Sequence, residues 1–567
     1  LRFYNLNWGV PFLHPDEFNI GLAVSRLQLP QHLNPDFFAY GSFPLYLIYV
    51  LGILWQSMAS GTIVDTLTAD QAILIGRYVS ATVSIINIYL VYVITKQLSL
   101  SFKFRIGIVT LCTFLVGSIQ YAHFATFESF LTFFYLAISI VSISILTNSN
   151  TKKYVLLGSL IGLAIGTKIV SVYLIVLPSI LFVLQKLFEN NTPEETTSFF
   201  ESFRHNLHVR LFLSKEVAIG LLTTLFVFLV TNPYIVLDYT SFDNSFTYER
   251  QVADGSLPVF YTRTFLETIP VLFQLQNVLP FISGPLFTII GSISLLAILF
   301  WSFYRVTPET LKYMVLMAVT YGYLIIHLSS YVKWTRYMIP VVPFMAITIG
   351  LILHHLYQAS SRKMLKGLLI CVSFILIVEI GMRGISFFGV YTLQDTRVEA
   401  AAWAEENVPT NATILSEVYD PSILPFNSPL GGQITLINMY DLHTPQPNFS
   451  QAATLSQLLE KTDYIILPSR RGYKTALRLP DTFPLNANYY TAIFDGSLGF
   501  KEVYTVDHNP CVVPEGGSFI EPIRNWLCIV DTYNAEETFV TFDHSSVKIF
   551  KKVTTMSQPE YYELITN

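Results

Sequence analysis

The chain has 567 residues, of which 52% are hydrophobic and 13% charged, and its mean hydropathy is +0.49. These values exclude a soluble globular protein and indicate a polytopic membrane protein embedded in the lipid bilayer. The formal net charge is -5, and the basic residues are not clustered on one face. We therefore expect no nucleic-acid partner.

The first 72 residues form a polar and aromatic stretch that contains an acidic pair, Asp16 and Glu17, close behind His14. The pair opens an amphipathic segment over residues 18–29. Asp16 is a good N-cap, and acidic residues suit the first turn of a helix, so the pair can serve the helix alone. The alternative is a functional site, which depends on the other polar residues that share its side of the membrane.

Ten apolar runs are close to the ~20 residues that cross a bilayer. The run at residues 43–59 is shorter and contains Pro44 and Gln56, so we predict a helix that lies in the membrane interface. The ten predicted spans are residues 73–95, 105–122, 129–147, 154–169, 170–187, 216–237, 284–303, 312–331, 337–357 and 366–389.

Lysine and arginine residues gather in alternate loops between these spans, as the positive-inside rule requires. The sets are Lys96, Lys103 and Arg105; Lys152 and Lys153; Lys186, Arg204, Arg210 and Lys215; Arg305 and Lys312; and Arg362, Lys363 and Lys366. We assign these loops to the cytoplasmic side of the cytoplasmic membrane.

The extracytoplasmic side then carries the first loop, residues 1–72, and the long loop over residues 238–283. It also carries the C-terminal region. A first loop on this side needs a span before it, so we expect one further span upstream of Leu1 and eleven spans in the parent protein.

The composition changes after the last span to polar runs with proline and glycine turns. We predict a transmembrane module over residues 1–390 and an extracytoplasmic soluble α/β domain over residues 391–567. Strands are expected at residues 412–416, 464–467, 526–530 and 547–553, and helices at residues 395–406 and 455–461. Cys511 and Cys528 lie in this region and can form a disulfide in an oxidising compartment.

Ionisable residues within or beside spans cost a few kcal/mol and usually mark a site or a water-filled cavity. Glu128, Lys168 and Arg336 join Asp16 and Glu17 on the predicted outer face. Each also has a structural explanation. Glu128 can begin a helix, Lys168 can extend its amine to the interface, and Arg336 can anchor a span.

Together, these carboxylates and cations suit one type of reaction. A carboxylate can take a proton from a hydroxyl nucleophile, and cations can hold a phosphate as bound substrate or as leaving group. The combination suits a membrane enzyme whose substrate has a lipid tail and an anionic head.

The first loop resembles that of the C-type glycosyltransferases, nearest to the protein O-mannosyltransferase and aminoarabinose-transferase-like group. The stretches that carry the resemblance are residues 14–17, 33–40 and 43–46, followed in the family's order by residues 122–134, 166–168, 232–234 and 336–340. The resemblance therefore covers most of the membrane part.

The resemblance implies an inverting transfer of a sugar from a polyprenyl-phosphate donor to a hydroxyl acceptor on a protein, a lipid or a glycan. It implies that Asp16 is the general base and that Glu17 has a structural or metal-related role. Glu128 stands where relatives more often carry Asp. Lys168 and Arg336 match positions suited to the donor phosphate.

We accordingly predict Asp16, Glu17 and Glu128 as catalytic residues. The predicted substrate-binding residues are His14, Tyr40, Lys168, Lys333 and Arg336. If a divalent metal ion is bound, Glu17 and Glu128 are the candidate ligands. A polyprenyl phosphate is a good leaving group, so cations can replace the general acid that glycoside hydrolysis uses.

Two other functions remain open. A transporter or flippase of lipid-linked sugars would also place aromatic and basic residues at membrane depth. The sequence shows no obvious internal repeat of the kind that many transporters carry, and its acids gather on one face. The third hypothesis is a non-catalytic sensor or assembly protein whose outer domain binds a ligand.

Overall fold

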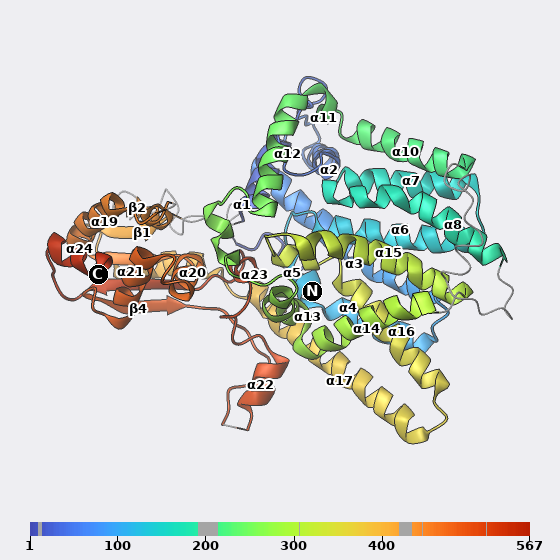
Figure 1. The fold of residues 1–567 in the computed structure, drawn as a ribbon. Coiled ribbons are helices and arrows are strands. Elements are labelled where there is room, and N and C mark those ends of the chain that lie inside the picture. Colours follow the sequence, from blue (N-terminus) through green and yellow to red (C-terminus); the bar gives the residue numbers. More distant parts are fainter. Residues whose placement is uncertain (10–13, 191–213, 305–306, 419–433, 445, 518) are drawn as a thin grey trace.

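Long apolar helices form one part of the molecule, and a small α/β unit forms the other (Figure 1). The structure is a computed structural model that describes all residues except 10–13, 191–213, 305–306, 419–433, 445 and 518, and only the backbone of residues 187–190. Of the predicted basic sets, Arg204, Arg210 and Arg305 therefore lie outside the described residues.

The predicted spans all fall on helices. These are α3 (Ala69–Gln97), α4 (Phe102–Phe114), α5 (Val116–Gln120), α6 (Glu128–Thr147), α7 (Thr151–Ile165), α8 (Leu177–Asn190), α10 (Lys215–Thr231), α14 (Pro285–Tyr304), α15 (Pro308–Ser329), α16 (Val342–Ala359) and α17 (Lys363–Phe388). Length and apolar composition alone mark 8 helices of the described residues as able to cross a membrane. The polytopic helical membrane fold is thus confirmed.

Apolar side chains on the outside of the bundle agree with a lipid environment. On α14 the exposed residues Ile289, Ile293, Leu296 and Phe300 recur at helical spacing, so they form one stripe along the helix. An exposed apolar stripe of this length would be costly in water and is favourable against lipid tails. The opposite side of α14 packs on α16 in the core.

Small residues allow a close approach of α7 and α10. A Cβ atom at Gly158 of α7 would lie 2.3 Å from the carbonyl oxygen of Gly220 on α10, and one at Gly162 would lie 2.7 Å from that of Thr224. The backbones of α7 and α10 therefore lie close together. Small residues at four-residue spacing allow this kind of close helix packing in membranes.

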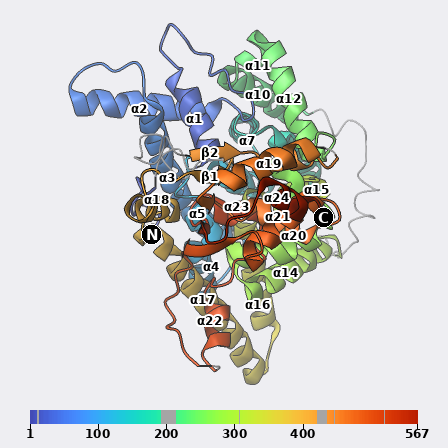
Figure 2. The same cartoon turned by 90° about the vertical axis from the view of Figure 1, so that its left-hand side faces the viewer.

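The helix α2 (Phe43–Ser60) is long and apolar enough to span by composition. It nevertheless runs across the bundle, since it is seen end-on in Figure 1 and lengthwise in Figure 2. This orientation agrees with the predicted interfacial helix. Its exposed Trp55 and Met58 are available to contact the membrane interface.

The helix ends that carry the predicted cytoplasmic loops lie at the end of the bundle away from the α/β unit (Figure 1). Two of the helices that begin at this end, α7 and α10, have a side-chain cap. Asn150 accepts from the backbone of Lys153 at the start of α7, and Ser214 accepts from Val217 at the start of α10. These caps satisfy amide groups that the first turn of a helix leaves without partners.

The α/β unit has a five-stranded sheet in the order β2-β1-β3-β5-β4. Its strands are β1 (Ile414–Glu417), β2 (Ile434–Ile437), β3 (Tyr464–Leu467), β4 (Phe500–Val506) and β5 (Val547–Lys552). The first three are parallel, and β5 is antiparallel to both β3 and β4.

Helices cover both faces of this sheet, because side chains along a strand point alternately to its two sides. On β3, Ile466 packs with α18 (Thr396–Asn407), whereas Ile465 joins the core under the helices of the other face. Those helices are α19 (Phe449–Lys461), α20 (Arg471–Arg478), α21 (Pro484–Asp495) and α24 (Gln558–Thr566).

Three of the predicted strands are close to β1, β3 and β5, and both predicted helices overlap α18 and α19. The prediction of a strand at residues 526–530 is wrong. This stretch begins with the last two residues of α22 (Glu521–Leu527), and Arg383 of α17 donates to the carbonyl oxygens of Trp526 (2.9 Å) and Cys528 (3.0 Å). The guanidinium therefore takes the carbonyl groups that a neighbouring strand would need.

The predicted disulfide between Cys511 and Cys528 is present in the structure. We expect a peptide map without reductant to contain one linked peptide that carries both cysteines, and reduction to separate it. Cys112 and Cys371 are free, and they serve as controls that should react with a thiol reagent after denaturation without reduction. Identical maps with and without reductant would contradict the pairing.

Candidate active site

A cavity of about 620 Å³ lies between the helix bundle and the α/β unit. Its walls come from the first loop, the link after α7, the helix α12 (Tyr239–Asp254), the 3-10 turn η6 (Thr335–Met338) and the α/β unit. Among the predicted site residues, His14, Asp16, Tyr40, Lys168 and Arg336 line it. Glu17, Glu128 and Lys333 do not.

An ion pair between Asp16 and Arg336 crosses the cavity wall. The Nη1 atom of Arg336 donates to Oδ2 of Asp16 and also to the hydroxyl of Tyr40 at 3.0 Å. Asp16 lies in the first turn of α1 (Pro15–Ser25), and Arg336 lies 320 positions later on η6. Their side chains are 25% and 23% exposed, so both can be reached from the cavity.

The charge state of Asp16 follows from these neighbours. Burial raises the pKa of its carboxyl group. The guanidinium of Arg336 and, less strongly, the amine of Lys168 lower this pKa, and the lowering outweighs the effect of burial. The net pKa lies below the usual value of Asp. Asp16 is therefore a carboxylate at neutral pH and can accept a hydrogen bond from a hydroxyl group.

Lys168 faces the same cavity between two aromatic rings. Its Nζ atom lies 5.5 Å from the ring centre of Tyr40 and 5.0 Å from that of Tyr337, within the range of cation–π attraction. It lies 3.7 Å from Oε1 of Glu128. At this distance the two side chains form an ion pair without a hydrogen bond.

Backbone contacts hold the first loop against Lys168. The amide of Gly41 donates to the carbonyl of Thr167 (3.1 Å), and that of Phe43 donates to the carbonyl of Gly166 (3.2 Å). A Cβ atom at Gly41 would lie 1.9 Å from the carbonyl oxygen of Gly166. Only glycine fits there, and the contact brings Tyr40 over Lys168.

Glu128 is the first residue of α6, as its structural explanation predicted, and it is buried behind Lys168. Its Oε2 atom has no hydrogen-bond partner among the described residues. The carboxylate lies outside the cavity lining and contacts the site through its pairing with Lys168.

Glu17 points into the protein, away from the cavity, and is fully buried. Both its oxygens accept from Arg77 of α3, at 2.9 and 2.7 Å, and Oε1 also accepts from the amide of Ala125 at 2.6 Å. These donors occupy the carboxylate, so Glu17 does not fit a metal ligand. In the part of the chain that the structure describes, no group of three or more His, Cys, Asp or Glu residues is arranged to hold a metal ion.

Lys333 is buried beside the cavity, and the structure does not bring its amine into it. The Nζ atom donates to the carbonyl of Tyr331 at 2.6 Å and lies against the ring of Phe265. Burial lowers the pKa of Lys333 to about 8. Its chain neighbours Val332 and Trp334 line the cavity instead.

His14 lies at the start of α1, between the rings of Phe124 (4.7 Å) and Phe542 (4.1 Å). Burial is the largest influence on its imidazole and lowers its pKa. Its Nδ1 atom has no hydrogen-bond partner within the described ranges. His14 is therefore a neutral ring that packs beside Asp16.

Several cavity residues had no assigned role in the sequence analysis. Glu249 and Arg250 come from α12, and Arg471, Thr538 and Phe542 come from the α/β unit. Glu249 and Arg250 were visible as charges in an outer loop. The other three gave no sequence signal, because no motif in the C-terminal region pointed to the membrane site.

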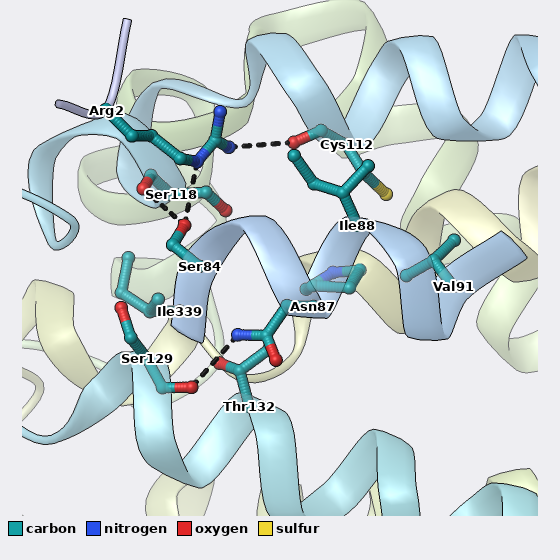
Figure 3. Close-up of a pocket in the computed structure, with 11 residues that line it drawn as sticks. Arg2, Ser84, Asn87, Ile88, Val91, Cys112, Ser118, Ser129, Thr132 and Ile339 are labelled. Carbon is teal, nitrogen blue, oxygen red and sulfur yellow. Dashed lines mark hydrogen bonds between the residues drawn. The ribbon is translucent and has the colours of Figure 1, made fainter. Parts of the chain in front are cut away.

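A second pocket lies under Arg2, in the helix bundle (Figure 3). Its volume is about 20 Å³, enough for one water molecule and too small for a substrate. Arg2 donates to the hydroxyl of Ser84 at 2.7 Å, and Asn87 donates to the carbonyl of Ser129 at 2.9 Å (Figure 3). We place the candidate active site in the larger cavity.

No protein-family model matches the sequence, and no curated protein matches it. Among solved structures, the chain is similar to the oligosaccharyltransferase AglB from Archaeoglobus fulgidus in complex with an inhibitory peptide and a dolichol-phosphate. The sequence identity is 12%, over 97% of this chain and 86% of that chain, with a TM-score of 0.47.

The chain is also similar to ArnT from Cupriavidus metallidurans bound to undecaprenyl phosphate. Here the identity is 12%, over 83% of this chain and 91% of that chain, with a TM-score of 0.44. AglB and ArnT are both C-type glycosyltransferases, the superfamily that the sequence motifs resemble.

The buried pair of Glu17 and Arg77 gives a prediction for stability. R77M leaves the Glu17 carboxylate buried without its cation, so we expect the free energy of unfolding to fall by about 3–5 kcal/mol. Thermal unfolding in detergent measures the change. The control is R26M, because among the described residues Arg26 donates only to backbone carbonyls, and it is exposed. Equal stability of the two variants would contradict a structural role for the pair.

Proposed function

We propose that the protein is an inverting glycosyltransferase that moves a sugar from a polyprenyl-phosphate donor to a hydroxyl acceptor. The observation that carries the proposal is the joint presence of Asp16, Lys168 and Arg336 in one cavity beside the apolar bundle. The site thus offers a carboxylate for a hydroxyl group, cations for a phosphate, and lipid-facing helices for a polyprenyl chain.

The proposed reaction is a single displacement. The acceptor hydroxyl donates a hydrogen bond to Asp16 and attacks the anomeric carbon from the face opposite the phosphate. A bond forms between the acceptor oxygen and the anomeric carbon, and the bond from that carbon to the phosphate oxygen breaks. The hydroxyl proton passes to Asp16, and the polyprenyl phosphate leaves with the bonding electron pair.

Arg336 serves both sides of this reaction in the proposal. Its Nη1 atom holds Asp16 in the ionised form, and its guanidinium lines the cavity, where its positive charge can attract a phosphate. Lys168 adds a second cation without a hydrogen bond to Glu128. Preorganised cations of this kind stabilise the charge that develops on a leaving phosphate.

The proposed location of the reaction follows from the predicted topology. The elements that line the cavity lie at the end of the bundle next to the α/β unit, opposite the ends with the basic loops (Figure 1). Under the positive-inside rule, this end is extracytoplasmic. We keep residues 1–390 as the membrane module and residues 391–567 as the soluble region.

The first test replaces the proposed base. We expect D16N to lower the rate of transfer from a synthetic polyprenyl-phosphate sugar at least ~100-fold, because an amide cannot take the hydroxyl proton, and to retain donor binding. The matched control is D36N, since Asp36 lies in the same loop outside this cavity and pairs with His32. Full activity of D16N would refute its role as base. No transfer by the wild type from any such donor would favour the transporter hypothesis.

The pH profile gives a second test. Transfer needs ionised Asp16, so the rate falls as pH drops through its pKa, which Arg336 holds below the usual value. R336Q removes this charge, so the pKa of Asp16 rises and the acid limb of the pH–rate profile moves to higher pH. R336K, which keeps a cation, should move the limb less. An unchanged limb in R336Q would show that the ion pair does not control the base.

A further inference from the structure

We propose that a segment of the α/β unit completes the membrane site, and that Glu536 in this segment is a positioning residue for the turn that carries Arg336. We call residues 535–545 the bridging segment. It lies between β4 and β5 in the sequence and includes the short helix α23 (Glu537–Thr541). Its effect on transfer rests on the proposed function.

Glu536 holds the beginning of the Arg336 turn. Its buried Oε2 atom accepts from the amide of Thr335 at 2.9 Å and from the hydroxyl of Thr335 at 2.7 Å. Thr335 is the first residue of η6, directly before Arg336. The carboxylate therefore does for this turn what an N-cap side chain does for a helix, although it comes from a position 201 residues away.

The other end of the bridging segment contacts the base side of the site. The ring of Phe542 stacks on His14 at 4.1 Å, and His14 occupies the N-cap position of α1, whose first turn carries Asp16. The segment thus touches the neighbours of both Asp16 and Arg336. Phe542 also lines the cavity itself.

The bridging segment is tied to both parts of the molecule. Gln120 of the bundle donates to the carbonyl of Phe539 at 2.8 Å, and Phe539 packs in the core of the bundle. On the other side, the buried carboxylate of Glu537 lies 2.7 Å from the amine of Lys474 in α20. Because the bridging segment is bound to both parts of the molecule, a movement of the α/β unit can shift the turn that carries Arg336.

The consequence for the reaction comes from the geometry that transfer requires. Without Glu536, the amide and hydroxyl of Thr335 lose their buried acceptor, which favours a shift of the turn. A displacement of ~1 Å at reacting groups can cost ~100-fold in rate. A shifted Arg336 would also hold Asp16 less firmly in its ionised form.

The experiment compares E536A with E379A in the full-length protein. Glu379 is a matched control because it is also a buried carboxylate, and its oxygens accept from the backbone amides of Leu286 and Phe287 and from the indole of Trp526. It does not line the cavity. E536Q, which keeps one acceptor oxygen, serves as the conservative variant if E536A does not fold.

Amide hydrogen exchange tests the contact without need of activity. We expect faster exchange in the peptide around residues 332–340 in E536A and unchanged exchange there in E379A, whereas E379A should speed exchange around residues 285–290. Unchanged exchange at residues 332–340 in both E536A and E536Q would overturn the proposal. This result does not depend on the reaction that the protein catalyses.

Transfer kinetics test the consequence. We expect E536A to lower kcat about 10- to 100-fold, as loss of a hydrogen bond to a charged group allows, with partial recovery in E536Q. The acid limb should move to higher pH in E536A and stay in place in E379A. In E536A/R336Q it should move no further than in R336Q, because both changes act on one interaction.

A wild-type acid limb in E536A, despite faster exchange at the turn, would reduce Glu536 to a structural role and overturn the proposal. If the wild-type protein transferred no sugar, the proposed function would fail first. The exchange measurement would then still decide whether Glu536 holds the turn.

Discussion

The ion pair between Asp16 and Arg336 is the interaction on which the proposed site depends. It joins the first loop to a turn 320 positions away. The loop and the turn therefore each need further contacts that fix their positions. On one side, Gly41 lies directly on the backbone of Gly166, which fixes the first loop against the bundle. On the other side, Glu536 holds the start of the turn that carries Arg336.

The buried carboxylates of the bundle are paired with partners of opposite charge or with hydrogen-bond donors. A buried charge is tolerated where a partner compensates it. Glu17 is saturated by Arg77 and a backbone amide, and Glu379 by backbone amides and an indole. At the cavity, Arg336 compensates Asp16 and also donates to the hydroxyl of Tyr40, and all three side chains line the cavity.

The C-terminal region belongs to the site as well as to its own sheet. Its cores lie on the two faces of the sheet, yet Phe539 and Phe542 pack in the core of the helix bundle. A division at residue 390 therefore separates the two folds, but the residues that line the cavity come from both sides of it. The cavity needs side chains from both.

The sequence by itself determined the membrane class, and it suggested the positions of the spans and the candidate base. Hydrophobic length and alternating basic loops are local properties, and lipid imposes them on any chain that crosses it. It also suggested Lys168 and Arg336, because charges beside spans are costly. Only the tertiary structure showed that Glu17 turns inward to Arg77, that Lys333 bonds to a backbone carbonyl, and that Glu536 and Phe542 reach the site. These contacts join positions far apart in the sequence, and no local periodicity encodes such pairings.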